Sequence, residues 1–233
     1  MDRYAAGEDI PYEQLRRVWT DTVGWSPTVT SLGYLNFFAQ VRAVNEGLPA
    51  SGQIHVWLGE PPIDWSKIKT QADMPQRSQR DQYPAELIQS QIIAKSKKAL
   101  VIYGTFHFFA MDSLKSLVEQ SNPGSFFVVT PHVVLSDQAH SESFERNMQA
   151  WRDYLSGKDG QKANTLLMIG NQGSPGDAVL YLGPSTSLTQ SPITPDLYLD
   201  TAFRSEINRR SLIMSGKPLD GTTPLMSPAY IGR

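Results

Sequence analysis

The chain has 233 residues, with 21 Lys and Arg, 23 Asp and Glu, and a formal net charge of -2. This balance excludes the broad positive surface that a nucleic-acid backbone requires, so we expect no nucleic-acid partner. The absence of cysteine excludes disulfides, thiolate nucleophiles and cysteine-ligated zinc, while 40% hydrophobic and 19% charged residues are typical of a folded globular protein.

Signals for membrane insertion or export are missing from the sequence. No apolar run approaches the roughly 20 residues of a membrane-spanning helix, and the first nine residues lack the basic start and apolar centre of a signal peptide. We therefore expect a soluble chain without a membrane span, which fits either a cytoplasm or a bacterial envelope. The length suits a single domain over 1–233, with a core at 1–182 and a C-terminal extension at 183–233.

The first half of the chain predicts helices that alternate with strands. Apolar residues recur at helical spacing over 32–48, and residues 53–58 then run apolar for the length of a strand. A second helical pattern over 80–98 leads directly into a second apolar strand at 99–103. This alternation is typical of βαβ units.

The second half continues the same alternation, with helices expected around 111–120 and 143–155 and strands near 126–130, 165–169 and 178–182. The order predicts an α/β fold, in which a mostly parallel sheet carries helices on both faces and binds ligands at the carboxyl ends of its strands. The extension contains one helical stretch at 195–210, and we expect its last residues to be loosely held.

His107 is the strongest single candidate for chemistry. It closes the apolar strand through Gly104-Thr-Phe-His107, where the glycine permits a sharp turn that would place the imidazole at the rim of the sheet. An imidazole at that position suits a general base or a metal ligand. The alternative is a histidine packed beneath Phe106, Phe108 and Phe109 with both ring nitrogens satisfied.

Three charged residues lie at other predicted strand and helix ends. Glu60 and Asp64 flank Pro61-Pro62, which would hold both carboxylates rigidly so that they orient or ionise a partner; alternatively, Asp64 caps a turn and Glu60 is solvated. Arg80 opens the predicted helix at 80–98, where its guanidinium either binds an anionic oxygen or lies solvated. We expect His107 within hydrogen-bond or one-water reach of Arg80 or Glu60.

The other three histidines, His55, His132 and His140, lie within or after predicted strands. None of them pairs with a second histidine or a carboxylate at the spacing of a local metal motif. We therefore interpret them as structural or surface residues that do not converge with His107. No Gly-x-Ser-x-Gly elbow and no Walker loop occurs, which argues against serine hydrolases and nucleotidases.

The chain resembles an uncharacterised bacterial family in six segments: Asp2–Pro11, Leu15–Trp19, Arg42–Asn45, Leu58–Trp65, Ala99–Gly104 and Asp177–Pro184. That family is distantly similar to the superfamily that holds erythromycin esterases, haem-binding uptake proteins and Tiki and TraB-type proteins. In the superfamily a Gly-x-x-His follows a central strand and an Arg-Asp pair opens the preceding helix. Gly104-Thr-Phe-His107 and Arg80-Asp81 are similar to these two motifs.

One motif of the superfamily has no counterpart in this sequence. It is a Gly-Glu-x-His motif after the first strand, which supplies an acid and a second histidine to the site. Relatives also carry strands before the segment that begins here at Asp2. The resemblance therefore implies a sheet that is incomplete at its N-terminal side.

The leading hypothesis from these observations is a hydrolase-type domain that acts on a small molecule. His107 would be its general base or, with a divalent metal as cofactor, a metal ligand; Arg80 would steady an anionic oxygen, and Glu60 or Asp64 would orient the site. The rival hypothesis is a haem- or small-ligand-binding protein in which Tyr103, Phe106 and Phe108 line the pocket without turnover. A third is a truncated, inactive remnant.

Overall fold

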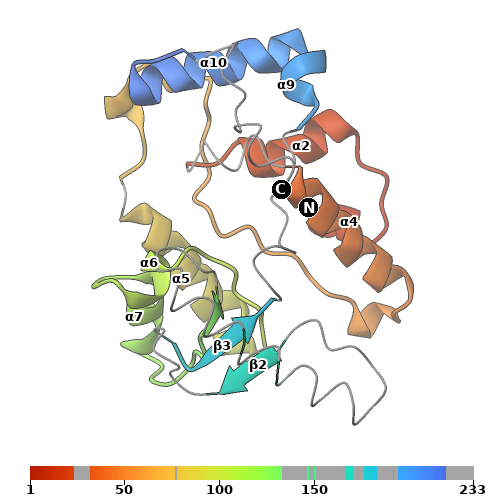
Figure 1. Ribbon diagram of the computed structural model, residues 1–233, viewed down its shortest axis with the longest axis vertical. Coiled ribbons are helices and arrows are strands. Elements are labelled where there is room, and N and C mark those ends of the chain that lie inside the picture. Colours follow the sequence, from red (N-terminus) through yellow and green to blue (C-terminus); the bar gives the residue numbers. More distant parts are fainter. Residues whose placement is uncertain are drawn as a thin grey trace. The chain divides into compact units, whose positions relative to one another are not determined.

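The computed structural model describes residues 1–23, 32–76, 78–132, 146, 150, 166–169, 176–182, 191 and 194–218. The chain divides into two compact units (Figure 1). The first unit comprises Met1–Leu87 and Gln190–Arg233, and the second comprises Ile88–Thr189. The predicted C-terminal extension is thus grouped, from residue 190 onward, with the first 87 residues. Within the described residues, no helix combines the length and the apolar character needed to cross a bilayer.

The first unit is helical in its described part. It contains α1 (Asp2–Ala5), α2 (Tyr12–Thr20), α4 (Gly33–Glu46), 3-10 turns at Ala50–Gly52 and Gln71–Asp73, the start of α5 (Gln79–Gln91), α9 (Asp196–Leu199) and α10 (Thr201–Ser215). Its core forms where the apolar faces of α2 and α4 meet, since Leu15, Trp19 and Phe38 are buried together. The rings of Trp19 and Phe38 stack with centroids 6.4 Å apart.

Two polar contacts tie α2 to α9 and α10. The hydroxyl of Tyr12 donates to Asp196 at 2.6 Å, and both terminal nitrogens of Arg16 donate to Asp200 at 3.0 Å. Asp200 also caps α10, because its other carboxylate oxygen accepts from the backbone N–H of Phe203 at 2.9 Å. The helix predicted at 195–210 is confirmed as this α9–α10 pair, and it belongs to the first unit.

The strand predicted at 53–58 is wrong, because that segment runs as irregular chain outside the sheet. Its backbone groups are satisfied by side chains instead of a neighbouring strand. Buried Asn45 accepts from the Ile54 N–H at 2.7 Å and donates to the Ile54 carbonyl at 2.9 Å, and Asp2 accepts from the Val56 N–H at 2.8 Å. These bonds compete directly with a β-ladder.

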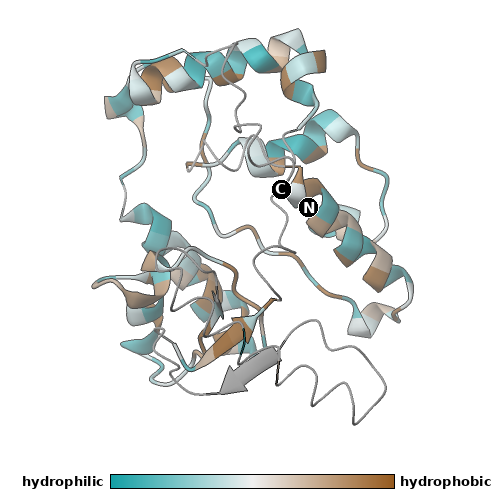
Figure 2. Cartoon of the chain, in the orientation of Figure 1, coloured by the Kyte–Doolittle hydropathy of each residue, from teal (hydrophilic) through white to brown (hydrophobic). Residues whose placement is uncertain are grey.

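The second unit holds a small sheet together with short helices. Its elements are the end of α5, a 3-10 turn at Ile93–Lys95, α6 (Phe106–Phe109), α7 (Leu114–Glu119), β1 (Val129–His132), β2 (Leu166–Ile169) and β3 (Ala178–Tyr181). The strand order is β1-β3-β2; β3 pairs parallel with β1, Val129 opposite Ala178, and antiparallel with β2, Ile169 opposite Ala178. In the central strand Ala178, Val179 and Tyr181 are buried, and Figure 2 colours this strand at the hydrophobic end of the scale.

A glycine with positive φ allows the chain just before β3 to lie close to the chain at β1. Gly176 has φ +127°, and a Cβ at this position would lie 2.9 Å from Thr130 Oγ1 and 3.0 Å from the Val128 carbonyl oxygen. The next residue, Asp177, bonds both backbone groups of Val128. Its N–H donates to the Val128 carbonyl, and its carboxylate accepts from the Val128 N–H at 2.7 Å. A side chain at position 176 would disturb this junction.

The architecture is α/β only in the broad sense. In the described part of the chain the sheet has three short strands and mixed direction, so the mostly parallel sheet with helices on both faces is not observed. The segment predicted as a strand at 99–103 is also irregular, with Leu100 85% and Ile102 64% exposed. The predicted helix at 143–155 lies outside the described residues, except for Arg146 and Ala150, which are helical.

Candidate functional site

Two residues predicted for the site form an ion pair. Arg80 donates from Nε to one oxygen of Glu60 at 3.1 Å and from Nη2 to the other at 2.8 Å. The side chains are 33% and 25% exposed, so water reaches the pair only partly. This two-point contact fixes both planar groups. The sequence predicts that the Arg80 guanidinium binds a substrate oxygen, but Glu60 already accepts from two of its nitrogens.

Asp64 acts as the cap of its own turn. One carboxylate oxygen accepts from the Ser66 N–H at 3.1 Å and from the Ser66 hydroxyl at 2.6 Å, and the other lies 3.3 Å from Lys67 Nζ. The hydrogen bonds from Ser66 are the main reason that the pKa of Asp64 lies below its ordinary value. Of the two roles left open by the sequence, the capping role is therefore observed.

His107 lies in the second unit, on the four-residue helix α6 rather than at the end of a strand. Its side chain is half-buried, and the ring of Tyr103 meets it edge-on with centroids 5.0 Å apart and planes at 72°. Tyr103 and His107 therefore share one small aromatic site. Glu60 and Arg80 belong to the first unit, so their predicted convergence with His107 stays a prediction.

Of the remaining histidines, only His55 has a described side chain. His55 lies 3.1 Å from Asp2 and is 58% exposed, His132 is the last residue of β1, and His140 lies outside the described residues. Within the ranges that the structure describes, no three His, Asp or Glu side chains come close enough to hold a metal ion.

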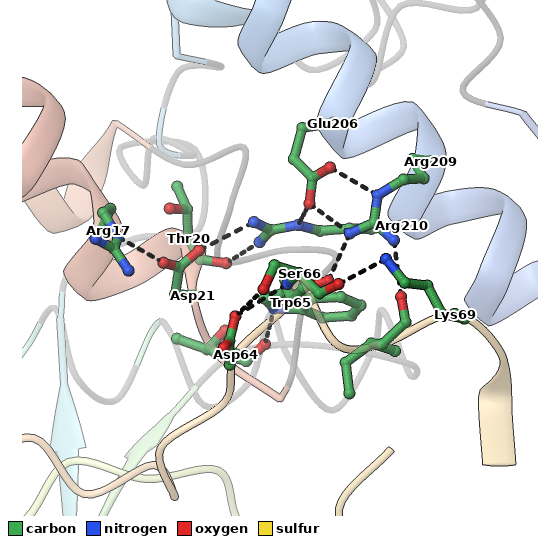
Figure 3. A network of polar contacts seen from close by, with 12 residues as sticks. Arg17, Thr20, Asp21, Asp64, Trp65, Ser66, Lys69, Glu206, Arg209 and Arg210 are labelled. Carbon is green, nitrogen blue, oxygen red and sulfur yellow. Dashed lines mark hydrogen bonds and ion pairs between the residues drawn. The ribbon is translucent and has the colours of Figure 1, made fainter. Parts of the chain in front are cut away.

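A polar hollow with charged walls lies in the first unit. Its cavity volume is about 610 Å³, and it opens between α10, the C-terminal end of α2 and the segment from 63 to 69 (Figure 3). Four cationic and three anionic side chains line it: Arg17, Lys69, Arg209, Arg210, Asp21, Asp64 and Glu206. Ile63, Trp65 and Ser66 complete the wall.

Arg210 is the buried centre of this network. Its guanidinium donates to the Thr20 carbonyl at 2.7 Å, to Asp21 at 3.0 Å and to Glu206 at 2.8 Å. It also lies over the ring of Trp65, 4.7 Å from the centroid. Since the side chain is only 7% exposed, these partners compensate a charge that water barely reaches.

Arg209 and Lys69 hold the turn at residues 65–68 from the other side. Arg209 donates to the carbonyls of Trp65 at 2.7 Å and Ile68 at 2.8 Å, and Lys69 Nζ donates to the Ser66 carbonyl at 2.6 Å. Arg209 additionally forms a two-point contact with Glu206, at 2.7 and 2.8 Å. Two cationic groups are thereby placed on one short turn of the wall.

The sequence interpretation did not identify this hollow, apart from Asp64. A partial signal was present, because Glu206 precedes Arg209 and Arg210 at the spacings that pair charges along a helix. That signal predicts local ion pairs on α10 but not the partners of Arg210 at the C-terminal end of α2, Asp21 and Thr20, which are 189 and 190 residues away in the sequence.

Comparison of the chain with protein families, curated proteins and solved structures finds no match.

Proposed function

We propose that the protein is a hydrolase-type domain in which His107 acts as a metal-free general base on a small ester substrate. The observation that carries the proposal is the state of this imidazole: it is half-buried, held edge-on against Tyr103, and still partly open to water. A neutral imidazole has one nitrogen that accepts a proton and one that donates a proton, which suits this side chain to general base catalysis.

The proposed step is the addition of water to an ester carbonyl. His107 accepts a proton from the water as its oxygen bonds to the carbonyl carbon. The tetrahedral intermediate then collapses, the bond from carbon to the alcohol oxygen breaks, and the imidazolium returns the proton to the departing alkoxide. Base catalysis of this kind contributes about 10²- to 10⁴-fold to the rate.

The test is hydrolysis of a nitrophenyl ester by the full chain and by His107→Gln. We expect the rate constant to fall at least about 100-fold in this variant. His55→Gln is the matched control, because His55 is an exposed histidine of the first unit. Equal rates in His107→Gln and the parent chain, or equal losses in both variants, contradict the proposal.

The role of Arg80 and Glu60 is tested separately. If their ion pair serves catalysis, Arg80→Lys and Glu60→Gln lower the ester hydrolysis rate at substrate saturation. If the pair is structural, both variants lower the free energy of unfolding, by about 1 kcal/mol for a partly exposed pair, and leave the rate unchanged. A double-variant cycle gives the coupling between the two side chains.

A second candidate function is the binding of a flat apolar ligand such as haem. It is favoured by the pairing of Tyr103 and His107, both possible axial ligands, close in sequence to the exposed apolar residues Ile102, Phe106 and Met111. In that case haem added to the full chain gives a shifted Soret band, which His107→Gln and Tyr103→Phe weaken and His55→Gln does not. Unchanged free-haem absorbance excludes this function.

A further inference from the structure

We propose that the hollow of the first unit binds a small oxyanion, a carboxylate or a phosphate, at the end formed by Lys69, Arg209 and Arg210. The proposal concerns the first unit alone and does not depend on the role of His107. It rests on how charge is distributed along the wall and on which donors the wall leaves for a ligand.

Charge is distributed unevenly between the two ends of the hollow. At one end Arg17 faces two carboxylates, because Asp21 accepts from its Nε at 2.9 Å and the charge of Asp64 also acts on it. At the other end Lys69, Arg209 and Arg210 share the wall with one carboxylate, Glu206. Two carboxylates from outside this end also act on these cations, because Asp21 pairs with Arg210 and Asp73 interacts with Lys69. On the wall itself cations outnumber carboxylates at the second end, which favours an anion there over the first end.

Lys69, one cation of the second end, keeps donors for a ligand. Within the described residues, Lys69 Nζ has one hydrogen-bond partner, the Ser66 carbonyl, although an ammonium carries three protons. Its position is defined by the same turn whose carbonyls hold Arg209 (Figure 3). A group that is fixed before the ligand arrives loses less side-chain freedom on binding.

The anionic member of this end stays charged at neutral pH. Partial burial alone would raise the pKa of Glu206, but hydrogen bonds from Arg209 and Arg210 lower it below the ordinary value. Glu206 therefore weakens the attraction for a second anion without abolishing it. Removing its charge should tighten oxyanion binding, an effect opposite in sign to that of removing Lys69.

The experiment is a titration of the full chain with inorganic phosphate and, in a second arm, with acetate, at constant ionic strength set by chloride. Binding is followed by two-dimensional NMR through the indole N–H of Trp65 and the backbone amides of Ser66 and Lys69. We expect saturable shifts with at least one of the two anions. The anion that saturates identifies which source of oxyanion the site accepts.

Three variants decide whether the binding belongs to this site. Lys69→Gln should weaken the affinity about tenfold, the loss of one charge-assisted hydrogen bond. Lys67→Gln is the matched control, because Lys67 is 81% exposed and does not line the hollow; it should change the affinity less than about twofold. Glu206→Gln should tighten binding, a gain that misfolding cannot imitate.

Three results would overturn the proposal. The first is the absence of saturation with both phosphate and acetate. The second is equal weakening by Lys69→Gln and Lys67→Gln, which indicates nonspecific attraction to surface charge. The third is shifts that saturate without involving Trp65, Ser66 or Lys69, which places the anion elsewhere.

Discussion

Arg210 closes the C-terminal end of α2 by donating to the carbonyl oxygen of Thr20, a residue 190 positions earlier in the chain, at 2.7 Å. The last carbonyls of a helix have no partner within the helix, so a buried donor from another element satisfies a group that would otherwise be costly. The same guanidinium pairs with Asp21 and Glu206. One buried arginine therefore bonds three residues of the first unit, so the stability of this unit should depend on it.

Replacement of Arg210 by leucine should destabilise the protein by about 3 kcal/mol, because the variant leaves the Thr20 carbonyl and Asp21 without their buried donor. The measurement is the free energy of unfolding from urea titration. Arg204→Leu is the control: Arg204 is exposed on the same helix, and its replacement should cost less than about 0.5 kcal/mol. Equal costs in both variants would show that the network adds no stability.

Asn45 should be a second site of high sensitivity. Its side chain is 2% exposed and connects α1 with the segment at 53–56, through the carbonyl of Ala5 at 2.9 Å and both backbone groups of Ile54. Asn45→Ala leaves these groups unsatisfied, and we expect a loss of about 2 kcal/mol in the free energy of unfolding. Asn36→Ala, at an exposed position of α4, should be neutral or slightly stabilising, since alanine favours helix.

Tyr12 should make the protein sensitive to alkaline pH. Burial, followed by the hydrogen bond to Asp196, raises the pKa of Tyr12 from 10.0 to about 12. A group with a raised folded-state pKa stabilises the fold fully below its unfolded value and loses that contribution as the pH rises through the folded value. Stability should therefore fall between about pH 10 and 12 in the parent chain, and less steeply in Tyr12→Phe.

The control for this alkaline effect is Tyr198→Phe. Tyr198 is 62% exposed on α9, so loss of its hydroxyl should leave the unfolding curve close to that of the parent chain. Chemical unfolding at a series of pH values, with tyrosinate absorbance recorded in parallel, provides the data. A parallel course of the parent chain and Tyr12→Phe over this range would refute the assigned cause.

Glu206 should make the protein less stable at acid pH, whereas Tyr12 makes it less stable at alkaline pH. Because the pKa of Glu206 is lowered from 4.5 in the folded state, its contribution to stability is present above about pH 4.5 and is lost as the pH falls through the lower folded value. The difference in unfolding free energy between the parent chain and Glu206→Gln should shrink over this range. A difference that stays constant from neutral to acid pH contradicts the prediction.

Helices with a clear apolar period were predictable from the sequence. The pattern at 32–48 corresponds to α4 at Gly33–Glu46, and the strand expected at 178–182 corresponds to β3 at Ala178–Tyr181. The strand expected at 53–58 failed for a tertiary reason, since the competing donors and acceptors come from Asn45 and Asp2. A local window of sequence does not contain those partners.

The candidate residues were predictable by type but not by contact. The sequence placed Glu60 and Arg80 together in one site, and they do form a pair, yet the guanidinium is engaged by the carboxylate itself. The cationic wall of the hollow was not predictable from the sequence, because Arg17 and Arg210 each lie in a segment that looks like the charged surface of an ordinary helix. Their proximity follows only from the packing of α2 and α10.

The pairs between α2 and the α9–α10 segment have a consequence for the order of events during protein synthesis. Tyr12 and Arg16 leave the ribosome about 180 residues before their partners Asp196 and Asp200. The second unit is one continuous stretch of chain and is fully synthesised in that interval. Tyr12 and Arg16 therefore lack these partners until the end of synthesis, and we expect the first unit to complete its fold later than the second.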